Sequence, residues 1–177
     1  MKKIIFFVYI IIQLISCSTL PPPPTPPPPD KIVCINVTSG EESNVYRRPH
    51  ALPITIYLLS DKHKIENKIE IAKKDKIIID DLMACSYNGN EEVLDCETAT
   101  QELNDTQAIK LRYNSSANYI LIAGSFCKRD KKKCIKIIPI NKFKQYYSSD
   151  PCVVLVDVNV GKYEFEIIEE EKDEMSW

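Results

Sequence analysis

A run of eight prolines within nine positions, PPPPTPPPP at residues 21–29, constrains the fold of this chain more than any other feature. Proline has a fixed φ and no backbone N–H, so the run excludes a helix or a central strand and predicts a polyproline II segment. At about 3.1 Å per residue, this segment is roughly 28 Å long and stiff. It divides the 177-residue chain into a short leader and a body of ordinary domain size.

The leader has the composition of an export signal. Lys2 and Lys3 precede an apolar stretch at residues 4–15, and small residues follow it. At about 1.5 Å per helical residue, the stretch is too short to cross a hydrocarbon core of about 30 Å. We therefore expect residues 1–16 to be a cleaved signal peptide. An exported chain does not meet cytosolic SH3-type domains, so we interpret the proline run as a spacer rather than as their ligand.

The sequence Leu-Ile-Ser-Cys at residues 14–17 resembles a bacterial lipobox. This resemblance implies that cleavage makes Cys17 the new N-terminus and that Cys17 carries acyl chains, because two or three chains hold a protein stably on a membrane. Ser18 resembles the residue at this position in lipoproteins of the outer membrane, which implies a periplasm-facing location on its inner leaflet. An ordinary secretory signal, in which Cys17 has no role, is the alternative. We expect residues 17–30 to form a lipidated stalk.

Charge and composition exclude several classes of function. A net charge of -2 and a pI near 5.8 leave no surplus of lysine and arginine for binding nucleic acid. Only two histidines are present, which excludes a His-rich metal centre and limits catalysis by a histidine base. The sequence also contains no CxxC, GxSxG or HExxH motif. We therefore expect no catalytic residue, no metal and no cofactor.

The cysteine count favours disulfides. Seven cysteines, less the lipidated one, leave an even number in an oxidising compartment. Six cysteines allow fifteen connectivities, so spacing alone does not settle the pairing. One candidate pair spans a hairpin with a charged tip at residues 128–133, a second closes a short loop, and the third follows by elimination. In that order the candidate pairs are Cys127 with Cys134, Cys85 with Cys96, and Cys34 with Cys152.

Short β-branched and aromatic runs bounded by turn residues predict a β-rich body at residues 31–168. The last run alternates after a turn, with Tyr163, Phe165 and Ile167 on one face and glutamates on the other, which predicts a C-terminal hairpin. Seven short strands favour a two-sheet sandwich. The predicted strands are Lys31–Val37, Ile54–Leu59, Ala108–Tyr113, Tyr119–Cys127, Cys134–Ile140, Val153–Val158 and Lys162–Ile168.

The pattern changes between the second and third predicted strands. Ile65, Ile69 and Ala72 follow a helical spacing, which predicts a short helix. Residues 68–71 also alternate like a strand, and residues 77–83 fit either structure. After the last strand, residues 169–177 are rich in acidic side chains and are expected to form a solvated tail.

Two runs, in this order, resemble the TssJ family, the outer-membrane lipoproteins of bacterial type VI secretion systems. Residues 53–61 (PITIYLLSD) resemble the second strand of that family. Residues 118–126 (NYILIAGSF) resemble a later strand, which a charged turn and a returning strand follow. The resemblance covers roughly Ile32 to Ile168. It implies a transthyretin-like two-sheet β-sandwich with one or two short helical insertions.

The family's role is to anchor the trans-envelope secretion complex by binding the periplasmic domain of the inner-membrane protein TssM. The loop between the first two strands makes that contact, and here it extends from Thr38 to Leu52. A solvated surface loop is the alternative for this segment. A periplasmic lipoprotein that binds a lipid or a sugar between its sheets is the alternative function. The partner-binding residues that the resemblance implies are Glu41, Glu42, Asn44, Tyr46, Arg47 and Arg48.

Overall fold

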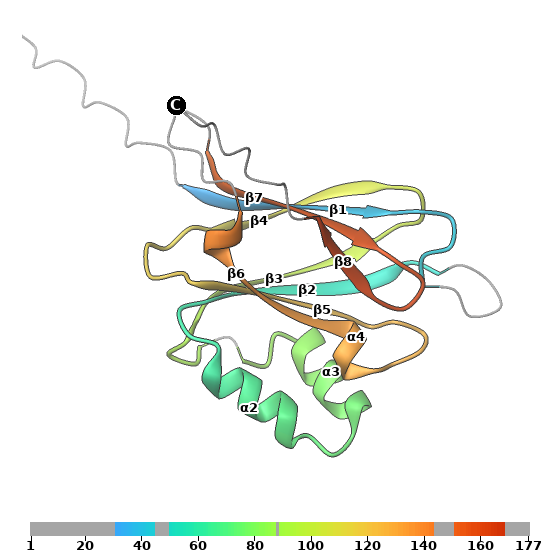
Figure 1. The fold of residues 1–177 in the computed structure, drawn as a ribbon, viewed down its shortest axis with the longest axis horizontal. Coiled ribbons are helices and arrows are strands. Elements are labelled where there is room, and N and C mark those ends of the chain that lie inside the picture. Colours follow the sequence, from blue (N-terminus) through green and yellow to red (C-terminus); the bar gives the residue numbers. More distant parts are fainter. Residues whose placement is uncertain (1–30, 45–49, 88, 144–150, 169–177) are drawn as a thin grey trace, which may run out of the picture.

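The structure, a computed structural model, describes residues 31–44, 50–87, 89–143 and 151–168. Within these residues, eight strands form two four-stranded sheets that are stacked face to face, so the predicted β-sandwich is confirmed (Figure 1). The first sheet has the order β4 (Thr106–Arg112), β1 (Ile32–Ser39), β7 (Cys152–Val160) and β8 (Phe165–Ile168). The second has the order β3 (Val93–Gln101), β2 (Leu52–Leu59), β5 (Tyr119–Gly124) and β6 (Ile135–Pro139).

Short helices follow β2 and β5. Helices α2 (His63–Ile71) and α3 (Asp75–Met83) lie on the outer side of the second sheet, at the bottom of Figure 1. The single-turn helix α4 (Lys131–Cys134) lies beside α3, and a 3-10 helix, η1 (Ile140–Lys142), follows β6. Both segments that the sequence left open between helix and strand are therefore helical. Among the described residues, no helix is long and apolar enough to cross a bilayer.

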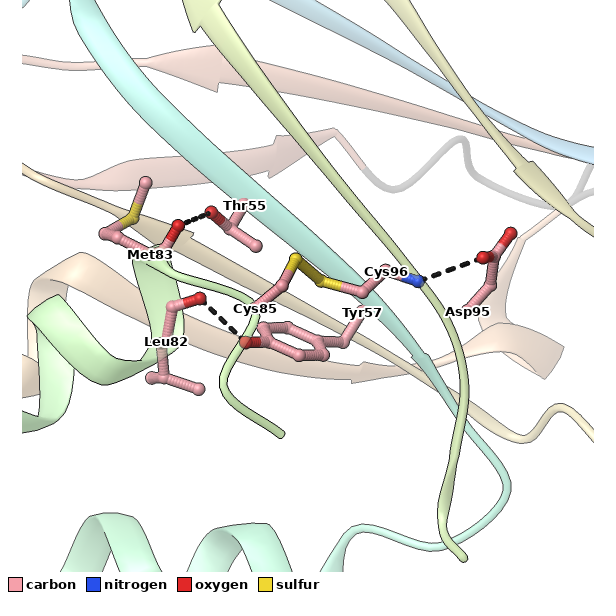
Figure 2. Close-up of a disulfide and its surroundings, with 7 residues drawn as sticks. All are labelled: Thr55, Tyr57, Leu82, Met83, Cys85, Asp95 and Cys96. Atoms are coloured by element: carbon pink, nitrogen blue, oxygen red, sulfur yellow. Dashed lines mark hydrogen bonds between the residues drawn. A yellow bond between two sulfur atoms is a disulfide. The ribbon is translucent and has the colours of Figure 1, made fainter. Parts of the chain in front are cut away.

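From Ile54 onward, strand β2 is buried on both faces, which explains why its residues are apolar apart from Thr55. On its outer face, the Thr55 hydroxyl donates to the Met83 carbonyl at 3.1 Å, and the Tyr57 hydroxyl donates to the Leu82 carbonyl at 2.7 Å (Figure 2). Because neighbouring residues of a strand point to opposite faces, Ile54 and its alternate neighbours point into the space between the sheets. The α3 segment thus covers the second sheet, and the first sheet covers its other face.

The two sheets approach closely at Gly124, the last residue of β5. A Cβ atom built on Gly124 would lie 2.5 Å from Cζ of Phe165 in β8 and 3.0 Å from the Phe126 ring. The Phe126 and Phe165 rings stack edge to face with centroids 5.0 Å apart. Glycine is therefore required at this position by packing, and the two rings fill the space between the sheets there.

The seven predicted strands are all present, with ends that differ from the prediction by at most three residues. The sequence did not indicate the eighth, β3, because only a few of its residues are apolar. Only its end residues, Val93 and Gln101, are buried, because β3 is at an edge of its sheet. Residues 1–16, 17–30 and 169–177, for which we predict a signal peptide, a stalk and an acidic tail, lie outside the described residues.

Two of the three candidate disulfides are present. Cys34–Cys152 joins the beginnings of the adjacent strands β1 and β7, with 5.6 Å between the Cα atoms. Cys85–Cys96 joins the segment after α3 to β3 and so fixes the helical cover to the sheet (Figure 2). The third pair was wrong, since Cys127 and Cys134 are free thiols.

The buried phenol of Tyr57 predicts a pH-dependent contribution to stability. Burial raises the pKa of Tyr57 above its ordinary value near 10. A raised pKa in the folded state means that the contribution is complete below the unfolded-state pKa and is lost as the pH rises beyond it. We expect Tyr57→Phe to lower the free energy of unfolding by about 1 kcal/mol at pH 7, because the Leu82 carbonyl loses the phenol as a donor and keeps only the Cys85 N–H, at 3.1 Å. The deficit relative to wild type should shrink at pH 10.5.

Urea unfolding at the two pH values measures this effect. Tyr113→Phe is the matched control, because Tyr113 is only half-buried and packs at the margin of the core. We expect its effect on stability at pH 7 to be small, since its side chain is only half-buried. A Tyr57→Phe deficit of the same size at pH 7 and pH 10.5 would contradict the assignment.

Candidate protein-binding surface

The first part of the β1–β2 loop, residues 40–44, is a turn held against the sandwich; we call it the loop base. The Ser43 hydroxyl accepts from the Gly40 N–H at 2.9 Å and donates to the Val160 carbonyl at 2.7 Å. The Asn44 N–H donates to the Gly161 carbonyl at 3.3 Å. The loop base is thereby attached to the end of β7 and to the turn between β7 and β8.

Asn44 also connects the loop base to the segment after β5. Its Oδ1 accepts from the Cys127 N–H at 2.6 Å, and its Nδ2 donates to the Ala51 carbonyl at 3.3 Å. Asn44 has φ 50°, in the left-handed region that asparagine tolerates better than most residues, and only 2% of it is exposed. Asn44 was predicted to contact a partner. In the structure its side chain is buried and has internal partners, so Asn44 supports the loop; its contact with a partner stays a prediction.

Cys127 and Cys134 do not pair because the segment between them is not the hairpin that the sequence suggested. The Asp130 carboxylate caps α4 by accepting from the Lys132 N–H at 3.0 Å, so the chain makes a helical turn before β6. The exposed Cys127 thiol donates to the Asn44 carbonyl at 3.5 Å. Cys134 is buried, and desolvation raises the pKa of its thiol.

The segment after β5 is fixed by charged contacts on its other side. The Arg129 guanidinium pairs with the Asp80 carboxylate of α3 at 2.6 Å and donates to the Ser125 hydroxyl at 2.9 Å. Lys133 pairs with Glu164, in the segment before β8, at 3.5 Å. Three segments are thus joined at this end of the sandwich: the loop base, the segment between β7 and β8, and the segment after β5. We call them together the platform.

The predicted partner-binding residues fall into three groups. Glu41 and Glu42 are exposed in the loop base, and Asn44 is buried beneath it. Tyr46, Arg47 and Arg48 lie outside the described residues. The loop continues at His50, which is exposed. The structure thus places two acidic side chains at the surface of the platform.

The platform depends on Ser43 and Cys127, whose roles the sequence analysis missed. The string Gly-Glu-Glu-Ser-Asn at residues 40–44 does carry a signal of the turn, because glycine, serine and asparagine are all typical turn residues. Nothing in the sequence marks the pairing of Asn44 with a cysteine more than eighty residues away. In the described part of the chain, no group of three or more His, Cys, Asp and Glu side chains is arranged to hold a metal.

Comparison with known proteins identifies the fold. Neither a protein-family model nor a curated protein sequence matches the chain. Among solved structures, the type VI secretion lipoprotein TssJ1 of Pseudomonas aeruginosa aligns with 81% of this chain and 99% of its own, with a TM-score of 0.58 and 10% identity. Lip of Serratia marcescens, a membrane-bound component of the type VI secretion system, aligns with 77% of this chain and 96% of its own, with a TM-score of 0.58 and 16% identity.

A third match is to a structure described as the type VI secretion protein TssM C-terminal domain (869–1107) from EAEC. It covers 78% of this chain and 98% of the matched chain, with a TM-score of 0.58 and 10% identity. The matched chains are covered almost completely, so the likeness concerns a whole domain. The chain therefore has the β-sandwich fold of the TssJ lipoproteins.

Proposed function

We propose that this chain is a lipoprotein component of a type VI secretion membrane complex, and that it acts by binding another protein rather than by catalysis. The observation that carries the proposal is the fold shared with TssJ1 and Lip over about four-fifths of the chain. The lipobox at residues 14–17, a feature of the sequence alone, also supports it.

The proposed anchor is Cys17, acylated and inserted in the inner leaflet of the outer membrane. Several acyl chains, at about 0.8 kcal/mol per buried methylene, suffice for a stable attachment without a transmembrane helix. The proline-rich stalk at residues 17–30 would then separate the sandwich from the lipid surface by up to its own length. This part of the proposal rests on the sequence alone.

The proposed partner is the periplasmic domain of a TssM-type inner-membrane protein, and the proposed contact is the β1–β2 loop. Two features support it: the loop base is held rigidly by Asn44 and Ser43, and Glu41 and Glu42 are exposed on it. Tyr46, Arg47 and Arg48 supply the residue types that most often carry binding energy. A rigid base limits the entropy that the loop loses when it binds.

Binding of the purified full chain to the periplasmic domain of a TssM-type protein from the same genome tests this proposal. We expect Arg47→Glu/Arg48→Glu to weaken binding at least tenfold, since arginine is enriched among the few interface residues whose loss costs about 2 kcal/mol or more. The control is Glu97→Lys/Lys110→Glu, which reverses two exposed charges on β3 and β4, away from the loop, and leaves the net charge unchanged. It should leave affinity unchanged. Failure of the oxidised wild-type chain to bind would refute the partner assignment.

A further inference from the structure

The connection between α2 and α3 exposes apolar side chains that the fold does not use. We call residues 71–77 (IAKKDKI) the helical tip. In the described part of the chain, the large hydrophobic residues that stand well exposed are Ile71 at 77%, Ile77 at 56% and Ile168 at 44%. Two of the three therefore lie at the helical tip, within one short turn of chain. Isolated exposed isoleucines need no explanation, but two together at one protruding point do.

These two isoleucines lie off the buried faces of their helices. In α2 the core side is made by Ile65, which is fully buried, and Ile69 packs partly against it. In α3 the buried residues are Ile78, Ile79 and Leu82. The fold is therefore complete without Ile71 and Ile77, whose side chains are left in contact with solvent.

The helical tip is positively charged as well as apolar. Lys73, Lys74 and Lys76 are exposed, and no carboxylate of the described residues lies within ion-pair distance of them. The acidic side chain of the tip, Asp75, is engaged at 3.7 Å by Lys131 of the neighbouring α4. Glu70 is exposed at its border, and Lys132 of α4 adds a further positive charge.

The helical tip is also held in a defined shape. The Lys131 ammonium donates to the Ile69 carbonyl at 3.3 Å and to the Ala72 carbonyl at 2.9 Å, which satisfies carbonyls at the end of α2. The disulfide Cys85–Cys96 fixes the other end of α3 to the sheet. The tip therefore presents its isoleucines and lysines without having to order a loop first.

We propose that the helical tip is a second membrane contact, which binds the surface of a bilayer that contains anionic phospholipid. Isoleucine side chains bury in the boundary of the bilayer while neighbouring lysines are attracted to its negative surface. A protein partner is a poorer fit, because lysine is depleted in protein interfaces and the tip has neither an arginine nor an aromatic residue.

The position of the helical tip is compatible with contact with the bilayer that holds the lipid anchor. In Figure 1 the tip is at the bottom, on the far side of the molecule from β1, where the described chain begins. With sheets about 10 Å apart and a helix layer about 10 Å thick, the distance across is roughly 25 Å. The fourteen residues from Cys17 to Lys31 can extend about 43 Å at 3.1 Å each, so both ends reach one bilayer. Once the lipid anchor is inserted, binding of the helical tip to the same bilayer is intramolecular. The effective concentration is then high, so a weak contact is sufficient.

Hydrogen exchange of the full lipidated chain, reconstituted in vesicles, tests this inference, which rests on the lipid anchor of the proposed function. Amides of residues 70–78 should exchange at least fivefold more slowly on vesicles of phosphatidylcholine with 30% phosphatidylglycerol than on phosphatidylcholine alone. The reason is that each lysine near an anionic surface strengthens membrane binding by about fivefold. The protection should disappear in 0.5 M salt. Equal exchange on the two vesicles would overturn the proposal, as would protection that appears only when a TssM-type domain is added.

Two variants locate the contact. Lys73→Glu/Lys74→Glu should abolish the protection, and Ile71→Ser/Ile77→Ser should reduce it at least threefold. The matched control, Lys110→Glu/Lys162→Glu, makes the same charge change elsewhere on the surface and should keep the protection. Loss in the control as well would indicate general attraction and overturn the assignment to the tip. Partner binding through the β1–β2 loop should be unchanged in the tip variants, so either proposal can fail without the other.

Discussion

Replacing Cys34 and Cys152 by alanine should lower the free energy of unfolding by about 5 kcal/mol, a large fraction of the stability of a domain this size. The bond closes a loop with a sequence separation of 118 residues. On the chain-entropy model, the longer the loop, the more the bond restricts the unfolded chain. Urea unfolding of the oxidised proteins, with unfolding followed by circular dichroism, measures the difference.

The second disulfide provides an internal control. Cys85–Cys96 has a sequence separation of 11 residues, so its removal by Cys85→Ala/Cys96→Ala should cost about 3 kcal/mol on the same model. The order of the two losses is the critical result. A greater loss from the short loop would show that the native contacts of Cys85, which fix the helical cover to the sheet, outweigh the entropy of the unfolded chain.

Asn44→Ala should destabilise the protein by about 2–3 kcal/mol and weaken partner binding at the same time. The change removes the acceptor of the Cys127 N–H and the donor to the Ala51 carbonyl, two contacts that are only partly accessible to water. It also places alanine at φ 50°, a strained conformation for a residue with a Cβ atom. With its base released, the β1–β2 loop has more freedom to lose on binding.

Two further substitutions separate these contributions. Asn44→Gly removes the same hydrogen bonds without the backbone strain, so it should be less destabilising than Asn44→Ala by about 1 kcal/mol. Asn44→Asp keeps the acceptor for Cys127 and should retain more stability than either. Thermal unfolding and the binding assay are made on the same samples. The role assigned to Asn44 is wrong if all three variants bind the partner as tightly as wild type.

Strand periodicity predicted most of the sandwich because its strands bury one or two complete faces. The alternation of Phe165 and Ile167 with glutamates indicates a strand with one buried face. The apolar run around Tyr57 indicates a strand with two buried faces. β3 was not predicted because it is an edge strand, in which Glu97 and Thr98 face solvent. It is recognised as a strand by its backbone pairing with β2, which the sequence does not show.

Other features depended on contacts between distant segments. The spacing of Cys127 and Cys134 suggested a bond, but the Asp130 cap produced a helical turn and moved the two sulfurs to different surroundings. For the β1–β2 loop, the resemblance and the residue types gave the candidate contacts. They did not distinguish the exposed Glu41 from the buried Asn44, since burial within a loop depends on the segments beneath it.

The placement of β1 determines how the protein would respond to force. If the lipid anchor precedes Lys31 and the partner holds the β1–β2 loop, tension enters and leaves through the two ends of a single strand. β1 is hydrogen-bonded to β4 on one side and to β7 on the other along nearly its whole length, so pulling along it shears both ladders together instead of opening one bond at a time. The covalent bond at Cys34 adds a fixed point near the entry. The other strands do not carry the tension directly. Of these, β4 and β7 hold β1 in place through their hydrogen bonds.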